Sequence, residues 1–379
     1  MTGSVRRRGE RSWEIKFDLG RNPVTGKRET RYHSFKGTKR EAQAALTRLT
    51  AEAQRGSYVE ATTETVGAFM DRWSRDWATA NVSPKTLERY NELIRNQVHP
   101  HIGSRPIQKL RPIDLNSLYA KLLRGGLAPR TVGHVHRLLH RAFSFAMTWD
   151  VVQKNVASSV RPPRVPEEEI EIIREDDIKA VLQKLRGQPL YPIATLALAT
   201  GMRRGELLAL RWQDVDLDSG TVRVERSLEE TKAGGLRFKE PKTKQGRRLI
   251  TIPPSIITEL RAHWKDQQER RLAIGAGKAS ADALVFPAWN GSPRSPNSLS
   301  KEWKAAMTEA EIEVSLHALR HTHASSLIAA GVDVLTISRR LGHASPSITL
   351  DVYGHLFKNT DDRAAQAIEA LFGKVGGSE

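Results

Sequence analysis

The sequence predicts a multidomain α+β protein, and three observations lead to this fold class. The chain has 379 residues, which exceeds one typical domain. Strand-like alternation of apolar and polar residues occurs only near the start and in a short stretch past the middle, whereas the remaining apolar periodicity is helical. We expect a small β-sheet-plus-helix domain over residues 1–58, an all-α domain over 62–158, and a mainly α domain with a small antiparallel sheet over 174–373.

The charge balance points to a polyanionic partner. The formal net charge is +17 with a sequence pI near 10.2, and nucleic acid is the commonest partner of so basic a chain. An anionic membrane surface is the alternative, but it calls for a basic amphipathic helix or a lipidation site, and neither is evident. No apolar run approaches the roughly 20 residues that cross a bilayer, and no apolar segment follows the basic start. There is no cysteine. We therefore expect a cytoplasmic, nucleoid-associated protein without a membrane partner.

Residues 1–58 predict a compact basic domain. Trp13, Ile15 and Phe17 alternate with polar residues, which indicates a strand. A turn over 22–26 and a partner strand over 30–35 follow, and residues 39–54 carry the apolar spacing of a helix. The first 60 residues hold 14 Lys and Arg against 7 acids, so this domain alone carries a charge of +7. A solvated basic cap is the alternative to a DNA-binding role.

Residues 62–158 predict a helical domain. The expected helices cover 66–77, 83–96, 112–123 and 129–149. One face of the last helix is apolar, and the opposite face carries Arg130, His134, Arg137 and Arg141. Prolines stiffen a predicted linker over 160–173, and residues 374–379 are expected to form a flexible tail.

The domain from residue 174 onward opens with an arginine box. An apolar helix over 193–200 ends at Gly201, and the segment TGMRRGELLALRW follows. In this segment Arg203 lies at the turn and Glu206 begins the next helix. A strand over 221–224 comes next, and EPKTKQGRRLITIP predicts a hairpin with a strand over 248–252. This hairpin contains Lys242 and Lys244.

The stretch from 315 to 355 brings four phosphate-handling or proton-handling groups together. Three helices are predicted, capped by Ser315, Asp333 and Ser345, and Gly331 and Gly342 end the first two. His317 and Arg320 share a helix face because they are three residues apart. His343 follows the end of the second helix, and Tyr353 lies ten residues further on.

The order Arg203, Glu206, Lys242, His317-x-x-Arg320, His343 and Tyr353 resembles the signature of the tyrosine recombinases, or phage integrase family. The resemblance spans nearly the whole chain. It implies a tyrosine recombinase fold with an arm-type DNA-binding domain, a SAM-like core-binding domain and a catalytic domain. Two positions depart from the family pattern. Asn155-Val156 stands where Asn-Pro is usual, and Ala318 stands where Asp is frequent.

The resemblance also implies a role for each residue of the signature. Tyr353 would attack a DNA phosphate and form a 3′-phosphotyrosyl bond. Arg203 and Arg320 would hold the non-bridging oxygens, and His343 would donate a further hydrogen bond to them. His317 would be the general base, Lys242 the general acid, and Glu206 the acid that orients the site. Arg204 is a neighbouring candidate for the first arginine, but the Arg-x-x-Glu spacing selects Arg203. Lys244 stays open as the alternative to Lys242.

The predicted DNA contacts are basic residues of the two N-terminal domains and one lysine of the hairpin. They are Arg6, Arg7, Arg8, Arg11, Lys16, Lys27, Arg28, Arg31, Arg130, His134, Arg137, Arg141 and Lys244. No cofactor and no metal are expected. His317 and His321 have the spacing of a zinc pair, but Ala318 stands where the His-Glu-x-x-His motif needs its glutamate.

The expected function is site-specific integration and excision of a mobile genetic element. The expected partners are double-stranded DNA at core and arm sites, a homotetramer on that DNA, a host DNA-bending protein and an excisionase-type directionality factor. A helix over 361–372 would pack either within its own chain or on a neighbouring subunit. Two other functions stay open, a type IB topoisomerase-like enzyme and a non-catalytic helix-turn-helix regulator.

Overall fold

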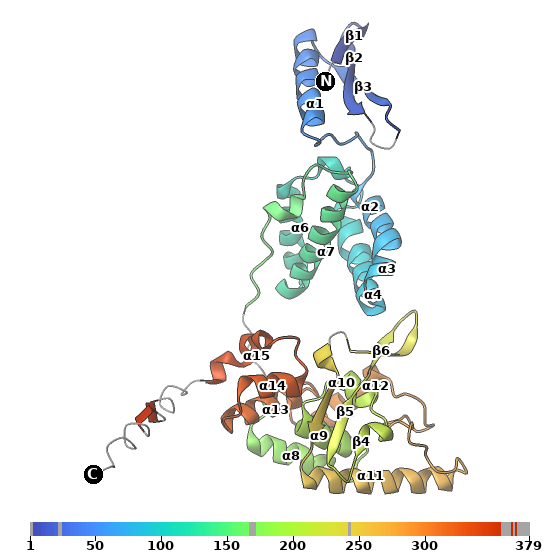
Figure 1. Ribbon diagram of the computed structural model, residues 1–379, viewed down its shortest axis with the longest axis vertical. Helices are drawn as coiled ribbons and strands as arrows, with labels where there is room; N and C mark the ends of the chain where they lie inside the picture. Colours follow the sequence, from blue (N-terminus) through green and yellow to red (C-terminus); the bar gives the residue numbers. More distant parts are fainter. Residues whose placement is uncertain are drawn as a thin grey trace. The chain divides into compact units, whose positions relative to one another are not determined.

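The computed structural model describes residues 3–21, 25–166, 172–241, 244–357, 365–366 and 368–369. The chain forms two compact units, residues 1–166 and 167–379 (Figure 1). Within the described residues, no helix has both the length and the apolar character needed to span a membrane.

The first unit begins with a three-stranded antiparallel sheet. Its strands are β1 (Gly3–Gly9), β2 (Ser12–Arg21) and β3 (Arg28–Lys36), in the order β1-β2-β3. Helix α1 (Lys39–Gln54) packs against one face of this sheet (Figure 1). The sequence did not predict β1, because only Val5 in that strand is apolar enough to show the alternation. The predicted turn over 22–26 lies partly outside the described residues.

A capping box starts helix α1, and an apolar core joins this helix to the sheet. The Thr38 hydroxyl accepts from the backbone N–H of Glu41, and the Glu41 carboxylate accepts in return from the Thr38 N–H. This capping box satisfies two N–H groups at the start of α1. Ile15 and Phe17 on β2 are fully buried, and they pack against Leu46 and other apolar residues of α1. The basic residues are therefore left to the outside.

A helical domain completes the first unit. Its α-helices are α2 (Val66–Trp73), α3 (Thr79–Asn81), α4 (Pro84–Leu93), α5 (His99–Ile102), α6 (Pro112–Arg124) and α7 (Pro129–Thr148). Two π-helical turns, η1 (Ser74–Ala78) and η2 (Ile94–Val98), join α2 to α3 and α4 to α5. Single 3-10 turns are η3 (Ile107–Lys109) and η4 (Val156–Ser159). The first two helical stretches therefore extend about one turn further than predicted.

The apolar face of α7 forms the centre of this helical domain. Val132, Val135, Leu139 and Ala142 are fully buried, as the helical spacing predicts. The opposite face of α7 is exposed and carries its basic residues.

The second unit is mainly helical. Its helices are α8 (Glu175–Leu185), α9 (Tyr191–Thr200), α10 (Arg204–Leu208), α11 (Pro254–Ala273), α12 (Pro296–Glu309), α13 (Ala318–Ala329), α14 (Val334–Leu341) and α15 (Pro346–Tyr353). Its strands are β4 (Val215–Asp216), β5 (Thr221–Val224), β6 (Ser227–Thr231), β7 (Gly235–Lys239) and β8 (Arg248–Thr251). Single 3-10 turns are η5 (Trp212–Asp214), η6 (Lys244–Gly246) and η7 (Gly354–Phe357).

The strand pairing differs from the predicted hairpin. Strand β8 pairs antiparallel with β5, in the order β4-β5-β8. The hairpin consists instead of β6 and β7, which form a separate two-stranded sheet between β5 and β8 in the chain. The segment over 240–247 therefore connects two sheets rather than turning within one hairpin. The prediction failed because β6 and β7 are largely polar and show little apolar alternation.

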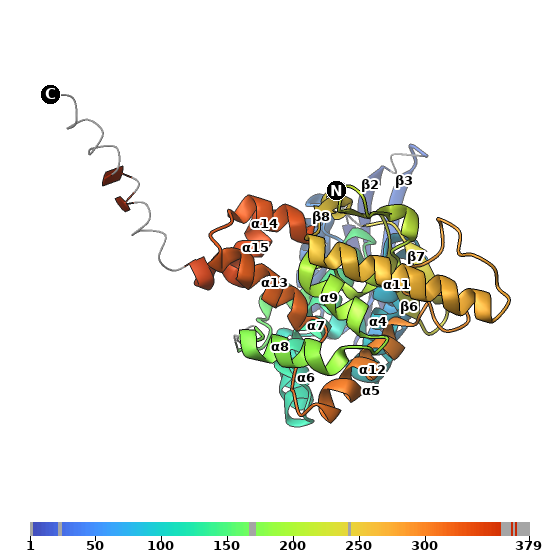
Figure 2. The ribbon, with the colours of Figure 1, turned by 90° about the horizontal axis from the view of Figure 1, so that it is seen from below.

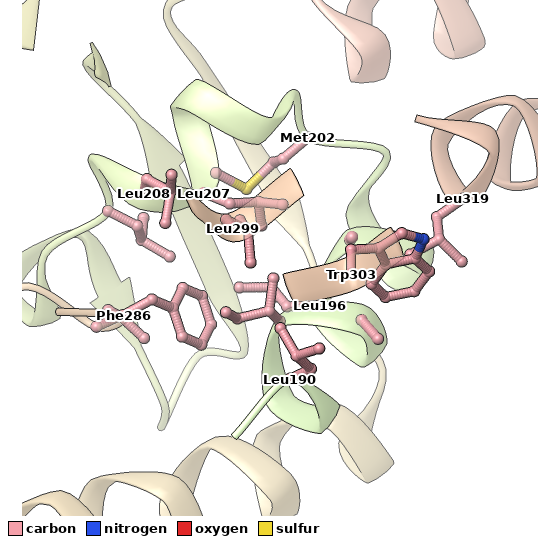
Figure 3. Packing of buried hydrophobic residues seen from close by; sticks show 14 of the residues in the cluster. Leu190, Leu196, Met202, Leu207, Leu208, Phe286, Leu299, Trp303 and Leu319 are labelled. Atoms are coloured by element: carbon pink, nitrogen blue, oxygen red, sulfur yellow. The ribbon is translucent and has the colours of Figure 1, made fainter. Parts of the chain in front are cut away.

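One apolar core holds the second unit together. Leu196 from α9, Leu208 from α10 and Trp303 from α12 converge in it with Leu319 from α13 (Figure 3). The last helices have a smaller cluster of their own, which includes Ile337, Leu341 and Tyr353. Helices α13, α14 and α15 lie together at one end of this unit, away from the β6–β7 hairpin, in both views (Figures 1 and 2).

Candidate active site

Three arginines from distant parts of the chain meet at the carboxyl end of α14. Arg248 donates through Nε to the carbonyl of Arg340 at 2.7 Å. Arg320 donates through Nη2 to the carbonyl of Leu341 at 2.8 Å, and Arg203 reaches the carbonyl of Gly342 at 3.3 Å. The last carbonyls of a helix lack partners within it and carry the negative end of its dipole. The end of α14 therefore holds three cations side by side.

Gly342 makes this arrangement possible. It has a positive φ of 66°, the left-handed conformation that ends helices and favours glycine. An ideal Cβ added to Gly342 would lie 2.7 Å from Nη1 of Arg248. A side chain at this position would therefore displace the guanidinium that packs against it.

One carboxylate links two of the arginines. Glu206 is 5% exposed, and its oxygens accept from Arg203 Nη1 at 2.9 Å and from Arg248 Nη2 at 2.8 Å. Burial alone would raise the pKa of Glu206. The hydrogen bonds and charge of Arg248, together with the backbone N–H of Arg203, outweigh that effect and lower the pKa. The Glu206 carboxylate is therefore ionised and holds both guanidiniums in place.

Arg320 is the most deeply buried of these cations. It is 4% exposed and bonds the carbonyl of Gly201, at the end of α9, as well as that of Leu341. Burial lowers the pKa of Arg320 to about 9, and the charge of Arg203 acts in the same direction. The side chain is still a cation at neutral pH. Three guanidiniums thus face a single carboxylate, which leaves a positive surplus suited to an anion.

His343 lies next to this cluster, directly after the end of α14. Its Nδ1 is 2.8 Å from the hydroxyl of Thr349, which is fully buried in α15. Burial lowers the pKa of His343 to about 4, with contributions from the charges of Arg320 and Arg203. His343 is therefore neutral at physiological pH.

Tyr353 ends α15 and is 1% exposed. Its hydroxyl is 2.8 Å from Nδ1 of His321 on α13. Burial raises the pKa of Tyr353, and the nearby charge of Arg320 opposes that rise. The family resemblance implies His317 as the base, and the His317 ring lies edge-on to that of His321 with 4.8 Å between centroids. The structure thus places the neighbouring histidine at the hydroxyl, one helical turn further along α13.

Several supporting residues could not be recognised from the sequence. Arg248 is one, because it opens the predicted strand over 248–252 and nothing distinguishes it from the other basic residues of that segment. Arg340 is another: it bonds the carbonyls of Ala199 and Thr251 and donates to Nε2 of His323. Burial lowers the pKa of His323 to about 4, so this histidine accepts as a neutral ring. These contacts tie α14 to α9 and β8. A buried arginine on a strand leaves no signal in apolar periodicity.

Lys242 lies outside the described residues, and so does the side chain of Lys244. The predicted tail over 374–379 lies outside them too, as does most of the predicted helix over 361–372. Among the described residues there is no group of three or more His, Asp or Glu side chains that could hold a metal ion.

The predicted DNA contacts of the first domain lie mostly on its surface. Arg6, Arg7, Arg8, Arg11 and Lys16 are exposed, as are Lys27 and Arg28. Some are held by local ion pairs. Arg8 pairs with Glu14 at 2.7 Å, Arg28 pairs with Asp18, and the half-buried Arg31 pairs with Glu29 at 2.7 Å. On α7, Arg130, His134, Arg137 and Arg141 are all exposed along one face. The guanidinium of Arg141 lies over the ring of Trp77, 4.6 Å from its centroid.

Two family profiles match the chain. The profile of the phage integrase family matches residues 171–360. The profile of the phage integrase N-terminal SAM-like domain matches residues 65–123. The two matches fall on the arginine-rich site and on the helical domain, respectively.

Curated relatives match along nearly the whole chain. A tyrosine recombinase XerC-like protein of Caldanaerobacter subterraneus is 28% identical, with 96% of this chain and 97% of that protein covered. The ICEBs1 integrase of Bacillus subtilis is 24% identical, with 97% of this chain and 100% of that protein covered.

Solved structures share the fold. The Tn1549 transposon integrase in complex with a circular intermediate DNA has a TM-score of 0.70 at 23% identity, covering 81% of this chain and 99% of that one. A lambda integrase tetramer bound to a Holliday junction has a TM-score of 0.54 at 18% identity, covering 90% and 96%.

Proposed function

The chain belongs to the phage integrase family, a family of site-specific tyrosine recombinases that cut and rejoin DNA, and on that premise we propose that Tyr353 is its nucleophile. Attack on a DNA phosphate would form a 3′-phosphotyrosyl bond and release a 5′ hydroxyl. The observation that carries this proposal is the cluster of Arg203, Arg248 and Arg320 at the end of α14, with a single carboxylate among them.

The arginines supply what the transition state needs. The non-bridging oxygens of the phosphate gain negative charge during attack, and preorganised cations stabilise that charge at little reorganisation cost. Arg203 and Arg320 are the proposed partners of those oxygens, and Arg248 holds Glu206 behind them. A neutral His343 that accepts at Nδ1 from Thr349 carries its own proton on Nε2, from which it can donate to the same phosphate.

Two proton transfers accompany the exchange. The Tyr353 phenol has an ordinary pKa of about 10, so a base must take its proton as the new bond forms. The family pattern points to His317 for this role, on the same helix as Arg320. Lys242 is the proposed acid that protonates the leaving 5′ oxygen, with Lys244 as the alternative. Because the phosphotyrosyl bond conserves the energy of the broken phosphodiester bond, rejoining needs no nucleotide cofactor.

The domains have proposed roles in holding DNA. Residues 1–58 would bind arm sites through basic residues of the β1–β3 sheet, and residues 62–158 would bind core sites through the exposed basic face of α7. The linker over 160–173 would join these to the catalytic domain over 174–373. Four copies would act on paired sites, as the lambda tetramer bound to a Holliday junction suggests. A host DNA-bending protein and an excisionase-type factor are the proposed accessory partners.

Covalent trapping tests the nucleophile. On a duplex nicked beside its cleavage site, the wild-type protein should accumulate a protein–DNA adduct, because the short fragment that carries the released 5′ hydroxyl diffuses away. Tyr353→Phe should form none while it binds the duplex with near wild-type affinity. An adduct that persists in Tyr353→Phe would refute the assignment. Strand exchange between two duplexes that carry the same site, measured with the wild type, separates a recombinase from a type IB topoisomerase.

A further inference from the structure

Three side chains from two helices form a contact that the family signature does not include. His321 lies on α13, four residues after His317 and therefore on the same helix face. Its Nδ1 is 2.8 Å from the Tyr353 hydroxyl at the end of α15. The two rings are tilted by 58° with 5.7 Å between their centroids. Among the described contacts of the hydroxyl, this is the one with a group that can accept a proton.

We propose that His321 takes the phenolic proton of Tyr353 as the phosphotyrosine forms. This inference rests on the proposed function and deepens it by naming the base. Its distance from the hydroxyl falls within the range of about 2.6–3.2 Å expected of a general base. In this assignment His321 replaces His317, to which the family pattern points, as the base; His317 packs edge-on against His321 and orients its ring.

The surroundings of the contact fit this role. The Tyr353 hydroxyl is shielded from solvent, so bulk water is a poor acceptor for its proton. Arg320, one residue before His321, is close enough for its charge to favour the phenolate.

The step balances in atoms and charge. The O–H bond of Tyr353 breaks, and the proton moves to Nδ1 of His321. The phenolic oxygen forms a bond to phosphorus, and the bond from phosphorus to the 5′ oxygen breaks. The leaving 5′ oxygen takes a proton from the general acid, for which Lys242 is proposed. Religation reverses each transfer, so His321 returns its proton to Tyr353.

Two substitutions at one position separate proton acceptance from positioning. His321→Ala removes the contact. His321→Asn keeps an acceptor near the place of Nδ1, but an amide is not basic enough to take the proton. The readout is the single-turnover rate of adduct formation on the nicked duplex. Both variants should lose on the order of 100-fold in this rate while DNA affinity is kept. Exposed His355 supplies the matched control, and His355→Ala should cleave like the wild type.

A more acidic phenol gives a second readout. Difluorotyrosine at position 353 ionises more readily than tyrosine and is a weaker nucleophile. Compared with ordinary tyrosine, it should therefore raise the rate of adduct formation by His321→Asn and lower the rate of adduct formation by the protein that keeps His321. This opposite response is not expected if His321 has only a structural role. A wild-type rate in His321→Asn with ordinary tyrosine would overturn the proposal.

Fluorine NMR tests the contact without DNA. In the free full-length protein, the resonance of difluorotyrosine at position 353 should shift in His321→Ala and stay in place in His355→Ala. An unchanged resonance in His321→Ala would overturn the inference and leave the proposed function intact. Conversely, the resonance could shift in His321→Ala as expected while the wild-type protein forms no adduct on the nicked duplex. That result would overturn the proposed function, and the role of His321 with it.

Discussion

Arg248 joins two parts of the site, because its guanidinium bonds both the Glu206 carboxylate and the end of α14. Its side chain and that of Glu206 are each 6% exposed. Removing Arg248 leaves the buried Glu206 carboxylate with Arg203 as its remaining cation, and breaking such a buried pair usually costs about 3–5 kcal/mol. Arg248 is therefore expected to stabilise the fold as well as the geometry of the site.

A double-mutant cycle checks this expectation. Arg248→Met should lower the free energy of unfolding by about 3 kcal/mol. The loss should be smaller when Glu206→Gln is already present, because the buried carboxylate is then gone. The measurement is urea unfolding of the two single variants and the double variant.

The exposed pair of Arg261 and Asp218 provides the matched control. Their charged groups are 2.7 Å apart, and their side chains are 55% and 93% exposed. Solvent screens such a pair, so its coupling energy should be below about 1 kcal/mol. An equally small coupling between Arg248 and Glu206 would show that the buried pair does not hold the site together.

At the residue scale, the resemblance to the family signature predicted which arginines and histidines belong together. Arg203, Arg320 and His343 do lie in one place, from segments more than a hundred residues apart. Spacing along the chain did not predict which histidine touches Tyr353, because His317 and His321 occupy the same helix face. The contact between His321 and the Tyr353 hydroxyl at the end of α15 distinguishes them in the structure.

At the scale of elements, the end of α14 organises the site. Three consecutive carbonyls, at 340, 341 and 342, each hold a different arginine. The left-handed turn at Gly342 leaves them open to those side chains. Leu341 anchors the helix by its complete burial in the smaller apolar cluster. A substitution at Gly342 should therefore slow DNA cleavage by more than its effect on the global stability of the protein would explain.

Two glycine substitutions in the same unit test the role of the turn. Gly342→Ala places a Cβ 2.7 Å from Arg248, whereas a Cβ at Gly187, whose φ is also positive at 77°, meets nothing within 4 Å. Both variants should lose about 1–2 kcal/mol of stability, because alanine is strained in the left-handed backbone conformation. Only Gly342→Ala should also slow single-turnover cleavage, by at least about tenfold. Equal cleavage by the two variants would contradict the proposed part of the turn.

The helices with clear end signals were predicted from the sequence, whereas α8, α11 and α12 were not, and the strands were predicted less well. The cap Asp333 and the terminal glycines Gly201 and Gly342 are local signals that the fold obeys. Strands β1, β6 and β7 are largely polar, although each pairs with its neighbour in the chain. Their backbone hydrogen bonds, rather than apolar alternation, hold them in place. That is why the hairpin was assigned to the wrong segment.

At the scale of the whole molecule, the two N-terminal domains have separate apolar cores. The β1–β3 sheet and α1 share one apolar cluster, and the helices over 66–148 share another. Removing the first cluster should therefore leave the second intact. Nearly all of the net charge of +17 lies in the first unit: residues 1–166 hold 30 Lys and Arg against 14 acids, and the rest of the chain holds 30 against 29. This distribution fits the DNA-holding roles proposed for the two N-terminal domains.

Deleting residues 1–58 tests the division of labour. The truncated protein should cleave a nicked core duplex at the wild-type rate, because the proposed catalytic residues lie in the second unit. Integration between substrates that carry arm sites should fall strongly. The measurement compares single-turnover cleavage with integration of the same two proteins. Unimpaired integration would remove the proposed arm-binding role from this domain.

The central claim is that the phenolic oxygen at position 353 replaces a sugar oxygen on a DNA phosphorus. The most direct measurement is mass spectrometry of the proteolysed adduct trapped on the nicked duplex. The expected result is a nucleotide attached through its 3′ phosphate to the peptide that contains Tyr353. A nucleotide attached to any other residue, or a cleaved duplex with no covalent peptide, would contradict the account.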